Sequence, residues 1–191
     1  PLAWDDTRKY DRGKVMTAAE LEAGKEFGRY LDVDGDGIPY RTYPGTHPTK
    51  GSFFTRGTSR DRYARYTEEG APYVDNMQRL VRKFDTAKDI VPRPLIATAE
   101  KPTKYGAIYY GSTSPAMDEA IHMIEARGHV LDRMRIRAFP FHSSVNSFVA
   151  DHDFAFVVEQ NRDSQLRSLI VNECGIDPVR LVPILHYDGT P

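Results

Sequence analysis

A chain of 191 residues is long enough for one sizeable hydrophobic core or for two small ones. Its 26 basic and 27 acidic residues leave a formal net charge of −1, which creates no field that would favour nucleic acid or an anionic membrane. No run of residues approaches the ~18 apolar residues that a membrane helix needs. Composition therefore points away from nucleic-acid and membrane partners.

Cysteine usage favours a reducing compartment. Cys174 is the only cysteine, so the chain forms no internal disulfide and cannot supply the about four thiolates of an iron–sulfur cluster. The first thirty residues lack a charged-then-apolar signal pattern, and we expect a cytoplasmic protein. The chain begins at Pro1 and stops at Pro191, and we interpret both ends as cuts in a longer protein; Trp4 lies too near one end to interpret.

The N-terminal part is predicted to hold two helices. Thr17 and Glu20 have the spacing of a capping box, which opens a helix with Leu21, Phe27 and Leu31 as its apolar positions. Apolar residues recur at helical spacing again between 73 and 84, which predicts a second helix over about 72–87. The intervening segment of about forty residues is longer than the ~12–15 residues that structureless loops usually reach. Such a segment is usually functional or ordered by a partner.

The remainder of the chain has the pattern of an α/β domain. Three prolines between 92 and 104 favour an extended connector, so we expect an N-terminal part at 1–91, a linker at 92–104 and a second domain at 105–191. Strands are predicted at 107–110, 134–139, 154–159 and 180–185. Helices are predicted from Ser114 as N-cap to Gly128, at 145–149, and from 166 to Gly175. Alternating strands and helices predict a layered domain with a mostly parallel sheet.

Several blocks of the sequence resemble one enzyme family. The residues 32–48 and 52–58 are the most specific of these blocks, and 63–68 and 157–161 look like the same family. The resemblance is to the alpha subunit of two-subunit 2-oxoacid:ferredoxin oxidoreductases, especially the 2-oxoglutarate type, and it covers essentially the whole chain.

This resemblance implies a fold and a set of partners. Residues beyond about 105 would form a three-layer α/β/α domain similar to the C-terminal domain of transketolase, and 1–91 would be the irregular tail of a thiamine-type domain. The family decarboxylates a 2-oxoacid on thiamine diphosphate, passes electrons to ferredoxin and captures the acyl group on coenzyme A. Mg²⁺ and the iron–sulfur cluster are expected mainly on the beta subunit. The isolated fragment is expected to be inactive.

Candidate site residues lie in the long middle segment. Arg56, Thr58 and Arg60 offer donors suited to a carboxylate or a phosphate, so they face a substrate or another subunit, or else they belong to a solvated basic loop. His47 is either an acid/base group or a structural histidine. The scattered His142, His152 and His186 have no metal-ligand spacing, and we assign them no chemistry.

A cation site is the further candidate. Asp32, Asp34 and Asp36 with Gly37 match the first half of a calcium loop, but Tyr43 stands where that loop needs a bidentate glutamate. The alternative is a plain turn rich in Asp and Gly. For the chain as a whole, the alternative to an enzyme subunit is a non-catalytic interaction or assembly module that retains the α/β domain.

Overall fold

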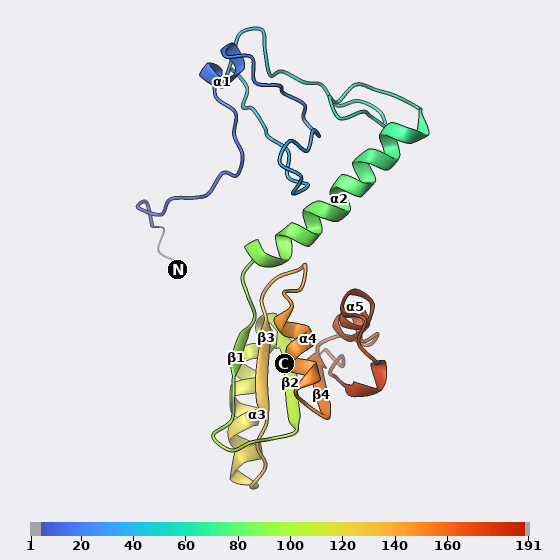
Figure 1. Ribbon diagram of the computed structural model, residues 1–191. Helices are drawn as coiled ribbons and strands as arrows, with labels where there is room; N and C mark the ends of the chain where they lie inside the picture. Colours follow the sequence, from blue (N-terminus) through green and yellow to red (C-terminus); the bar gives the residue numbers. More distant parts are fainter. Residues whose placement is uncertain (1–4, 190–191) are drawn as a thin grey trace. The chain divides into compact units, whose positions relative to one another are not determined.

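The computed structural model describes residues 5–189, and Trp4 lies outside them. The chain divides into two compact units between Thr86 and Ala87, inside the long helix α2 (Gly70–Ile90). The first unit consists mainly of loops around α2 and the short helix α1 (Ala18–Glu22), as Figure 1 shows. The second unit contains all the strands that the structure assigns within the described residues.

Helix α1 begins at the predicted capping box. The Thr17 hydroxyl accepts a hydrogen bond from the Glu20 backbone N–H at 3.3 Å, and the Glu20 carboxylate accepts one from the Thr17 N–H at 2.8 Å. The predicted extension through Phe27 and Leu31 is wrong. The helix ends at Glu22, shortly before Gly24 takes a left-handed φ of 84°.

Helix α2 confirms the second predicted helix but buries a different face. The apolar residues Tyr73, Val81 and Phe84 are 49%, 64% and 49% exposed, whereas the polar Asn76 and Arg79 are buried. The loop at Gly37 explains this orientation, because a Cβ there would lie 2.2 Å from the backbone nitrogen of Lys83. Only a glycine permits that backbone to pack so closely against the polar side of α2.

The second unit is built on a five-stranded sheet in the order β1-β3-β2-β4-β5. Its strands are β1 (Leu95–Ala97), β2 (Tyr105–Tyr110), β3 (Asp132–Ile136), β4 (Phe154–Glu159) and β5 (Leu181–Leu185). Strand β1 is antiparallel to β3, and the other neighbouring strands are parallel. The prediction of a mostly parallel sheet is confirmed.

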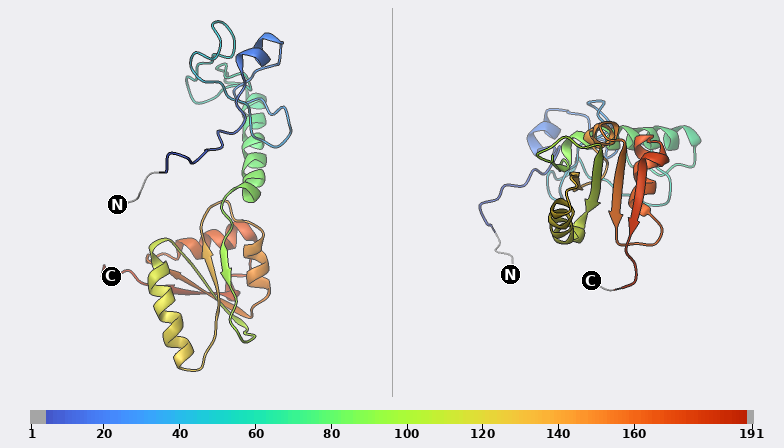
Figure 2. Two further views of the ribbon diagram at one scale, coloured as in Figure 1. Left: turned by 90° about the vertical axis from the view of Figure 1, so that its left-hand side faces the viewer. Right: turned by 90° about the horizontal axis from the view of Figure 1, so that it is seen from below.

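Helices cover both faces of this sheet. Helices α4 (Ser144–Ala150) and α5 (Gln165–Cys174) pack on the face that carries Ile108, Met134 and Val157. Helix α3 (Ser114–Ala126) packs on the opposite face, where Met117 and Ile121 contact Ala107 and Tyr109. Figure 2 shows the resulting layers, with α3 on one side of the sheet and α4 and α5 on the other. The predicted three-layer arrangement is therefore present.

Two local predictions need correction. Ser114 lies inside α3, because a 3-10 turn at Gly111–Thr113 precedes it and Thr113 occupies the N-cap position without a side-chain hydrogen bond. Strand β3 ends at Ile136, earlier than predicted. The segment predicted as a linker at 92–104 contains β1, which pairs with β3 at the edge of the sheet. The three residues of β1 are apolar, but a run this short after Pro92 and Pro94 is not enough to identify a strand.

A buried carboxylate caps α5. Ser164 at the N-cap position makes no side-chain hydrogen bond to the helix. Instead Glu159, at the end of β4, accepts hydrogen bonds from the backbone N–H groups of Leu166 at 2.8 Å and Arg167 at 3.1 Å. The Asn161 side chain donates a third at 2.6 Å. Glu159 is fully buried, so its charge faces the positive end of α5 away from water.

Candidate functional site

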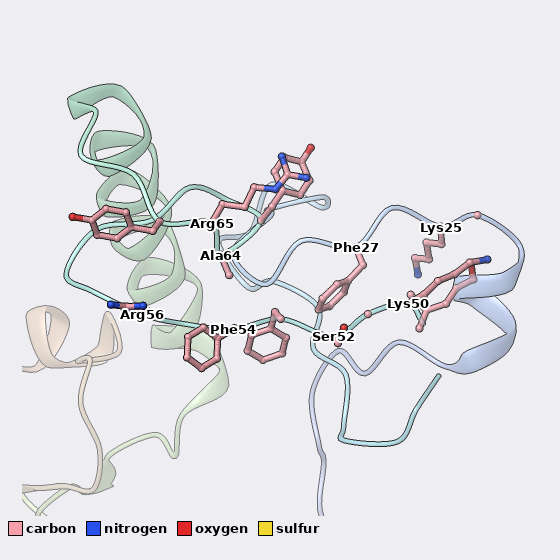
Figure 3. A pocket seen from close by; sticks show the side chains of 14 residues that line it. Lys25, Phe27, Lys50, Ser52, Phe54, Arg56, Ala64 and Arg65 are labelled. Carbon is pink, nitrogen blue, oxygen red and sulfur yellow. The ribbon is translucent and has the colours of Figure 1, made fainter. Parts of the chain in front are cut away.

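An open cleft of about 830 Å³ lies in the first unit. Four of its lining residues are basic, namely Lys25, Lys50, Arg56 and Arg65, and none is acidic. Figure 3 shows Lys25 and Lys50 at one end of the opening, near α1, and Arg56 at the other end. A cleft with this charge attracts anions.

Aromatic rings form much of the cleft wall. Phe27, Phe53, Phe54, Tyr63 and Tyr66 all line it, and the rings of Phe27 and Phe53 lie 6.1 Å apart. Phe54 is 77% exposed. Flat, accessible rings beside cations suit a ligand that combines an apolar or aromatic part with negative charge.

A strained turn positions two of the lining residues. The carboxylate of Asp61 accepts hydrogen bonds from the backbone N–H groups of Tyr63 and Arg65, each at 2.9 Å. Ala64 between them is buried and has a φ of 67°, a left-handed conformation that costs a non-glycine residue roughly 1–2 kcal/mol. The hydroxyl of Tyr63 donates to Glu26 at 2.5 Å, and this hydrogen bond raises the pKa of Tyr63.

Two of the four cleft cations are already paired. Lys25 donates to Glu20 at 3.0 Å, which raises the pKa of the ammonium. Hydrogen bonds from the Thr17 backbone and from Lys25 lower the pKa of Glu20 to about 2. Lys50 donates to the Glu22 carboxylate at 3.0 Å. Both lysines therefore hold the α1 end of the cleft together.

Arg56 is one of two cleft cations that make no ion pair within residues 5–189, and Arg65 is the other. The side chain of Arg56 is exposed at the cleft. The guanidinium of Arg65 lies 5.5 Å from the centre of the Tyr63 ring. Arg56 thus combines an unneutralised charge with the planar donor geometry that suits carboxylates and phosphates.

The structure separates the predicted site residues. Arg56 lines the cleft, whereas Thr58 and Arg60 line a second, smaller cavity against α2. Gly57 allows this divergence, because its φ is 75° and a Cβ at this position would lie 2.6 Å from the ring of Tyr66. Arg60 donates to the Gly57 carbonyl at 2.6 Å and to the Tyr30 hydroxyl at 3.2 Å.

His47 orders its own loop. Its Nδ1 accepts hydrogen bonds from the backbone N–H groups of Thr49 at 3.1 Å and Lys50 at 2.9 Å, and its Nε2 contacts the carboxylate of Glu22. The side chain is 4% exposed. The hydrogen bonds from His47 and Lys50 lower the pKa of Glu22. Every polar atom of the imidazole is engaged, which favours the structural interpretation of His47.

The aspartate loop is neutralised by the protein itself. Lys14 Nζ lies 2.7 Å from Asp34 and 2.7 Å from Asp36, and Arg82 lies 3.1 Å from Asp32. Asp32 also accepts a hydrogen bond from the Gly37 N–H at 2.9 Å. A metal ion would have to displace the Lys14 ammonium. Among residues 5–189, no group of three or more His, Cys, Asp or Glu side chains is arranged to hold a metal.

Two histidines of the second unit take part in packing, whereas His186 is exposed. His152 is buried, with Nδ1 2.6 Å from the Phe148 carbonyl and Nε2 3.1 Å from Asp132. His142 Nδ1 accepts a hydrogen bond from the Ser144 backbone N–H at 3.1 Å, at the start of α4. Burial raises the pKa of the Cys174 thiol, which packs against the core. These environments belong to a folded scaffold.

Sequence reasoning missed several of the residues that the structure brings together. Lys25 and Phe27 are far from Arg56 in the sequence and join it only through loop packing, and Lys50, which precedes Arg56 in the same segment, was not singled out. Asn76 and Arg79 were not identified, because they lie on the polar side of an amphipathic helix, and this side is expected to face water. Their spacing of three residues places them on one face of α2, which was the one signal available.

Comparisons with known proteins give a likeness in fold. No family model matches the chain, and no curated protein matches it in sequence. The architecture of the chain, loops and α2 followed by a mixed α/β sheet domain, is shared with a solved oxidoreductase. That structure is a 2-oxoglutarate:ferredoxin oxidoreductase from Magnetococcus marinus with 2-oxoglutarate, coenzyme A and succinyl-CoA bound.

The match covers 88% of this chain at a TM-score of 0.74 and 21% identity, and this chain spans 29% of that one. The alpha chain of a probable 2-oxoacid ferredoxin oxidoreductase from Thermoplasma acidophilum also matches, at 21% identity over 44% of this chain and 74% of that one. Its TM-score of 0.28 is too low to indicate a shared fold. At these identities the likeness establishes the fold, and the function must be argued from the site.

Proposed function

We propose that this chain forms part of the alpha subunit of a 2-oxoacid:ferredoxin oxidoreductase that acts on 2-oxoglutarate. The complete enzyme would decarboxylate the 2-oxoacid, transfer the acyl group to coenzyme A and pass electrons to ferredoxin. The basic, aromatic cleft around Arg56 is the observation that carries this proposal. The fold shared with the Magnetococcus marinus enzyme over 88% of the chain supports it.

The chemistry of the cleft suits these reactants. 2-Oxoglutarate carries two carboxylates, and coenzyme A carries phosphates and an adenine ring. Arg56 would bind a carboxylate or a phosphate through its planar donors, and exposed rings such as Phe54 would take the apolar or aromatic part. No acidic residue lines the cleft, and Glu20 and Glu22, which contact its lining, are paired with Lys25 and Lys50, so the repulsion that such anions would meet is limited.

The cofactors are assigned mainly to the partner subunit. Thiamine diphosphate supplies the carbanion chemistry, and an iron–sulfur cluster supplies the path for electrons. A cluster needs about four thiolates, whereas this chain has only Cys174. The carboxylates nearest to a Mg²⁺ ligand set, Asp34 and Asp36, are held by Lys14. This chain's own residues would therefore bind and orient the acidic substrates.

A pull-down with this chain as bait, from an extract of its source cell, tests the proposal. We expect mass spectrometry to identify a cluster-bearing beta subunit, and the eluate to oxidise 2-oxoglutarate with ferredoxin in a coenzyme-A-dependent reaction. Recovery of neither the subunit nor the activity would contradict the proposal.

A matched pair of bait variants tests the cleft. Arg56→Ala removes charge-assisted hydrogen bonds, so activity per recovered beta subunit should fall about tenfold or more. Arg162→Ala removes an equally charged side chain that is 74% exposed in the second unit, and activity should stay unchanged. Equal activity of both variants would remove Arg56 from the site while leaving the assembly role open.

One observation favours the alternative of an interaction module. The first unit exposes an apolar stripe along α2 that includes Tyr73, Val81 and Phe84. Exposed apolar stripes of this kind are typical of surfaces that another protein covers. If the bait recovers the beta subunit but Arg56→Ala leaves activity intact, an assembly role without substrate binding becomes the better description.

A further inference from the structure

A second cavity in the first unit has the properties of a small-ligand site. Its volume is about 170 Å³, and it lies between α2 and the segment that follows Gly57. Tyr30, Ser59, Arg60, Asn76 and Arg79 contribute to its wall. It shares no lining residue with the cleft around Arg56.

Three buried polar atoms in this wall make no hydrogen bond within the described residues. They are Ser59 Oγ, Asn76 Oδ1 and Arg79 Nε. Asn76 is 8% exposed and Arg79 is 6% exposed, so water outside the protein does not satisfy them. More than about nine in ten buried polar groups in proteins have a partner, and three unpaired groups around one cavity point to a ligand that pairs with them.

The basic residues that line this cavity favour an anionic ligand. Arg79 donates through Nη1 to the Gly37 carbonyl at 3.0 Å, which leaves Nε–H free. The guanidinium groups of Arg79 and Arg60 lie 5.6 and 5.8 Å from the centre of the Tyr30 ring, and the lining contains no acidic residue. The Nε edge of a guanidinium is one of the two edges that bind a carboxylate side-on.

The surroundings of Arg79 leave its charge poorly compensated. Burial, and then the nearby Arg29, lower the pKa of Arg79. Asp32 acts in the opposite direction, but its carboxylate is bound to Arg82 at 3.1 Å. An anion within the cavity would stabilise the Arg79 guanidinium where the protein does not.

Asn76 requires that the ligand also carry a hydrogen-bond donor. Its Nδ2 donates to the Arg60 carbonyl at 2.6 Å, and this partner fixes the orientation of the amide. Oδ1 is therefore an acceptor without a donor. A ligand ammonium would be repelled by Arg60 and Arg79, so the matching donor is a hydroxyl. At ~30 Å³ per water molecule, the cavity holds the equivalent of roughly five or six waters, which limits the ligand to a few non-hydrogen atoms.

We propose that this cavity binds a short hydroxycarboxylate, with its carboxylate on Arg79 and its hydroxyl on Asn76. Ser59 donates a further hydrogen bond to the carboxylate. The proposal is independent of the function assigned to the Arg56 cleft, because the two cavities are separate.

Calorimetric titration of the 191-residue chain with glycolate, acetate and inorganic phosphate at constant ionic strength tests the site. Glycolate should bind saturably at one site. Acetate should bind about fivefold more weakly, because it lacks the hydroxyl that donates to Asn76. Absence of saturable glycolate binding up to about 20 mM would overturn the site. Tighter binding of phosphate than of glycolate would overturn the assignment to a carboxylate.

Two variants and a control identify the cavity as the place of binding. Asn76→Asp puts a carboxylate in the wall that Arg79 shares and removes the hydrogen bond to the Arg60 carbonyl, so glycolate affinity should fall more than about tenfold in protein that circular dichroism shows to be folded. Arg79→Lys keeps the charge but loses the planar donor edge, and affinity should fall about fivefold. Arg62→Ala, at an exposed ion pair with Asp75, should leave affinity within about twofold. Unchanged affinity in a folded Asn76→Asp or Arg79→Lys variant would refute the proposal.

Discussion

Replacement of Glu159 by Gln tests the role of the buried carboxylate that caps α5. The substitution preserves the size and shape of the side chain but exchanges one acceptor oxygen for an NH₂ group. In the wild type, three N–H donors at 2.6–3.1 Å converge on the carboxylate, two of them from the backbone of α5. In the variant, one donor faces another donor in a site that water does not reach.

The free-energy cost of Glu159→Gln follows from these contacts. Hydrogen bonds to a charged group contribute about 1.5–3 kcal/mol each, and a buried donor without a partner costs about 1–3 kcal/mol. Loss of the charge at the helix N-terminus adds about 0.3–1 kcal/mol, up to ~2 when partly buried. Since one acceptor oxygen remains, we expect the local opening of α5 to become easier by about 2–3 kcal/mol. This corresponds to roughly 30- to 150-fold faster amide exchange.

Hydrogen exchange read by mass spectrometry on peptides covering 165–174 measures this change directly. The matched control is Glu173→Gln, the same substitution at an exposed position of the same helix. The control should change exchange less than about twofold. Exchange in Glu159→Gln that matches the control would refute the argument that the carboxylate holds the start of α5.

Three further predictions concern the first unit. Burial raises the pKa of Asp36, but the hydrogen bonds from Lys14 and from the Ile38 backbone and the charge of Lys14 outweigh it, so the pKa is lowered. The pair should therefore stabilise the folded chain above about pH 4 and lose its effect as pH falls through the lowered pKa. Lys14→Met should cost about 1 kcal/mol in urea unfolding at pH 7 and less at pH 2. An equal loss of unfolding free energy at both pH values would show that the ion pair is not the cause of the destabilisation. Ala64→Gly should raise the unfolding free energy by up to about 1 kcal/mol. Glycine tolerates the φ of 67°, and the larger entropy that it loses on folding offsets part of this gain. A clear loss of stability would show that packing of the Ala64 methyl group matters more than the strain. Gly37→Ala should lower the unfolding free energy by more than about 3 kcal/mol, because the new Cβ would collide with the backbone of α2. Gly35 has a similar φ of 78° but no neighbouring atom at the Cβ position, so Gly35→Ala should cost about 1 kcal/mol. Similar losses of stability in the two variants would contradict the close approach of Gly37 to α2.

Local sequence patterns identified most elements of the second unit. Strand β4 was predicted with the bounds that it has, because a run of apolar residues covered on both faces is distinctive. Gly175 in a left-handed conformation ends α5 as predicted, since glycine has no Cβ to clash there. Strand β1 was missed because three exposed residues among prolines have no periodicity. Its place in the sheet depends on its hydrogen bonds to β3.

The candidate sites were only partly accessible from the sequence. The resemblance directed attention to Arg56, Thr58 and Arg60 as one group, yet they serve two cavities. The positive φ of Gly57 separates them, and no composition rule predicts which way each side chain points. Lys25 and Lys50 line the cleft beside α1, where they pair with Glu20 and Glu22. The capping box predicted the start of α1 but not its position in the unit.

The sequence by itself determined the alternation of strands and helices, the capping box at Thr17 and the presence of α2, because these depend on interactions between residues close along the chain. Only the tertiary structure decided which face of α2 is buried. The backbone at Gly37 packs against the polar side and takes the Nη1 hydrogen bond of Arg79, so a charged residue becomes buried and an apolar stripe stays exposed. Such a contact joins residues 42 positions apart, and its energy comes from hydrogen bonding and close packing that no local pattern contains.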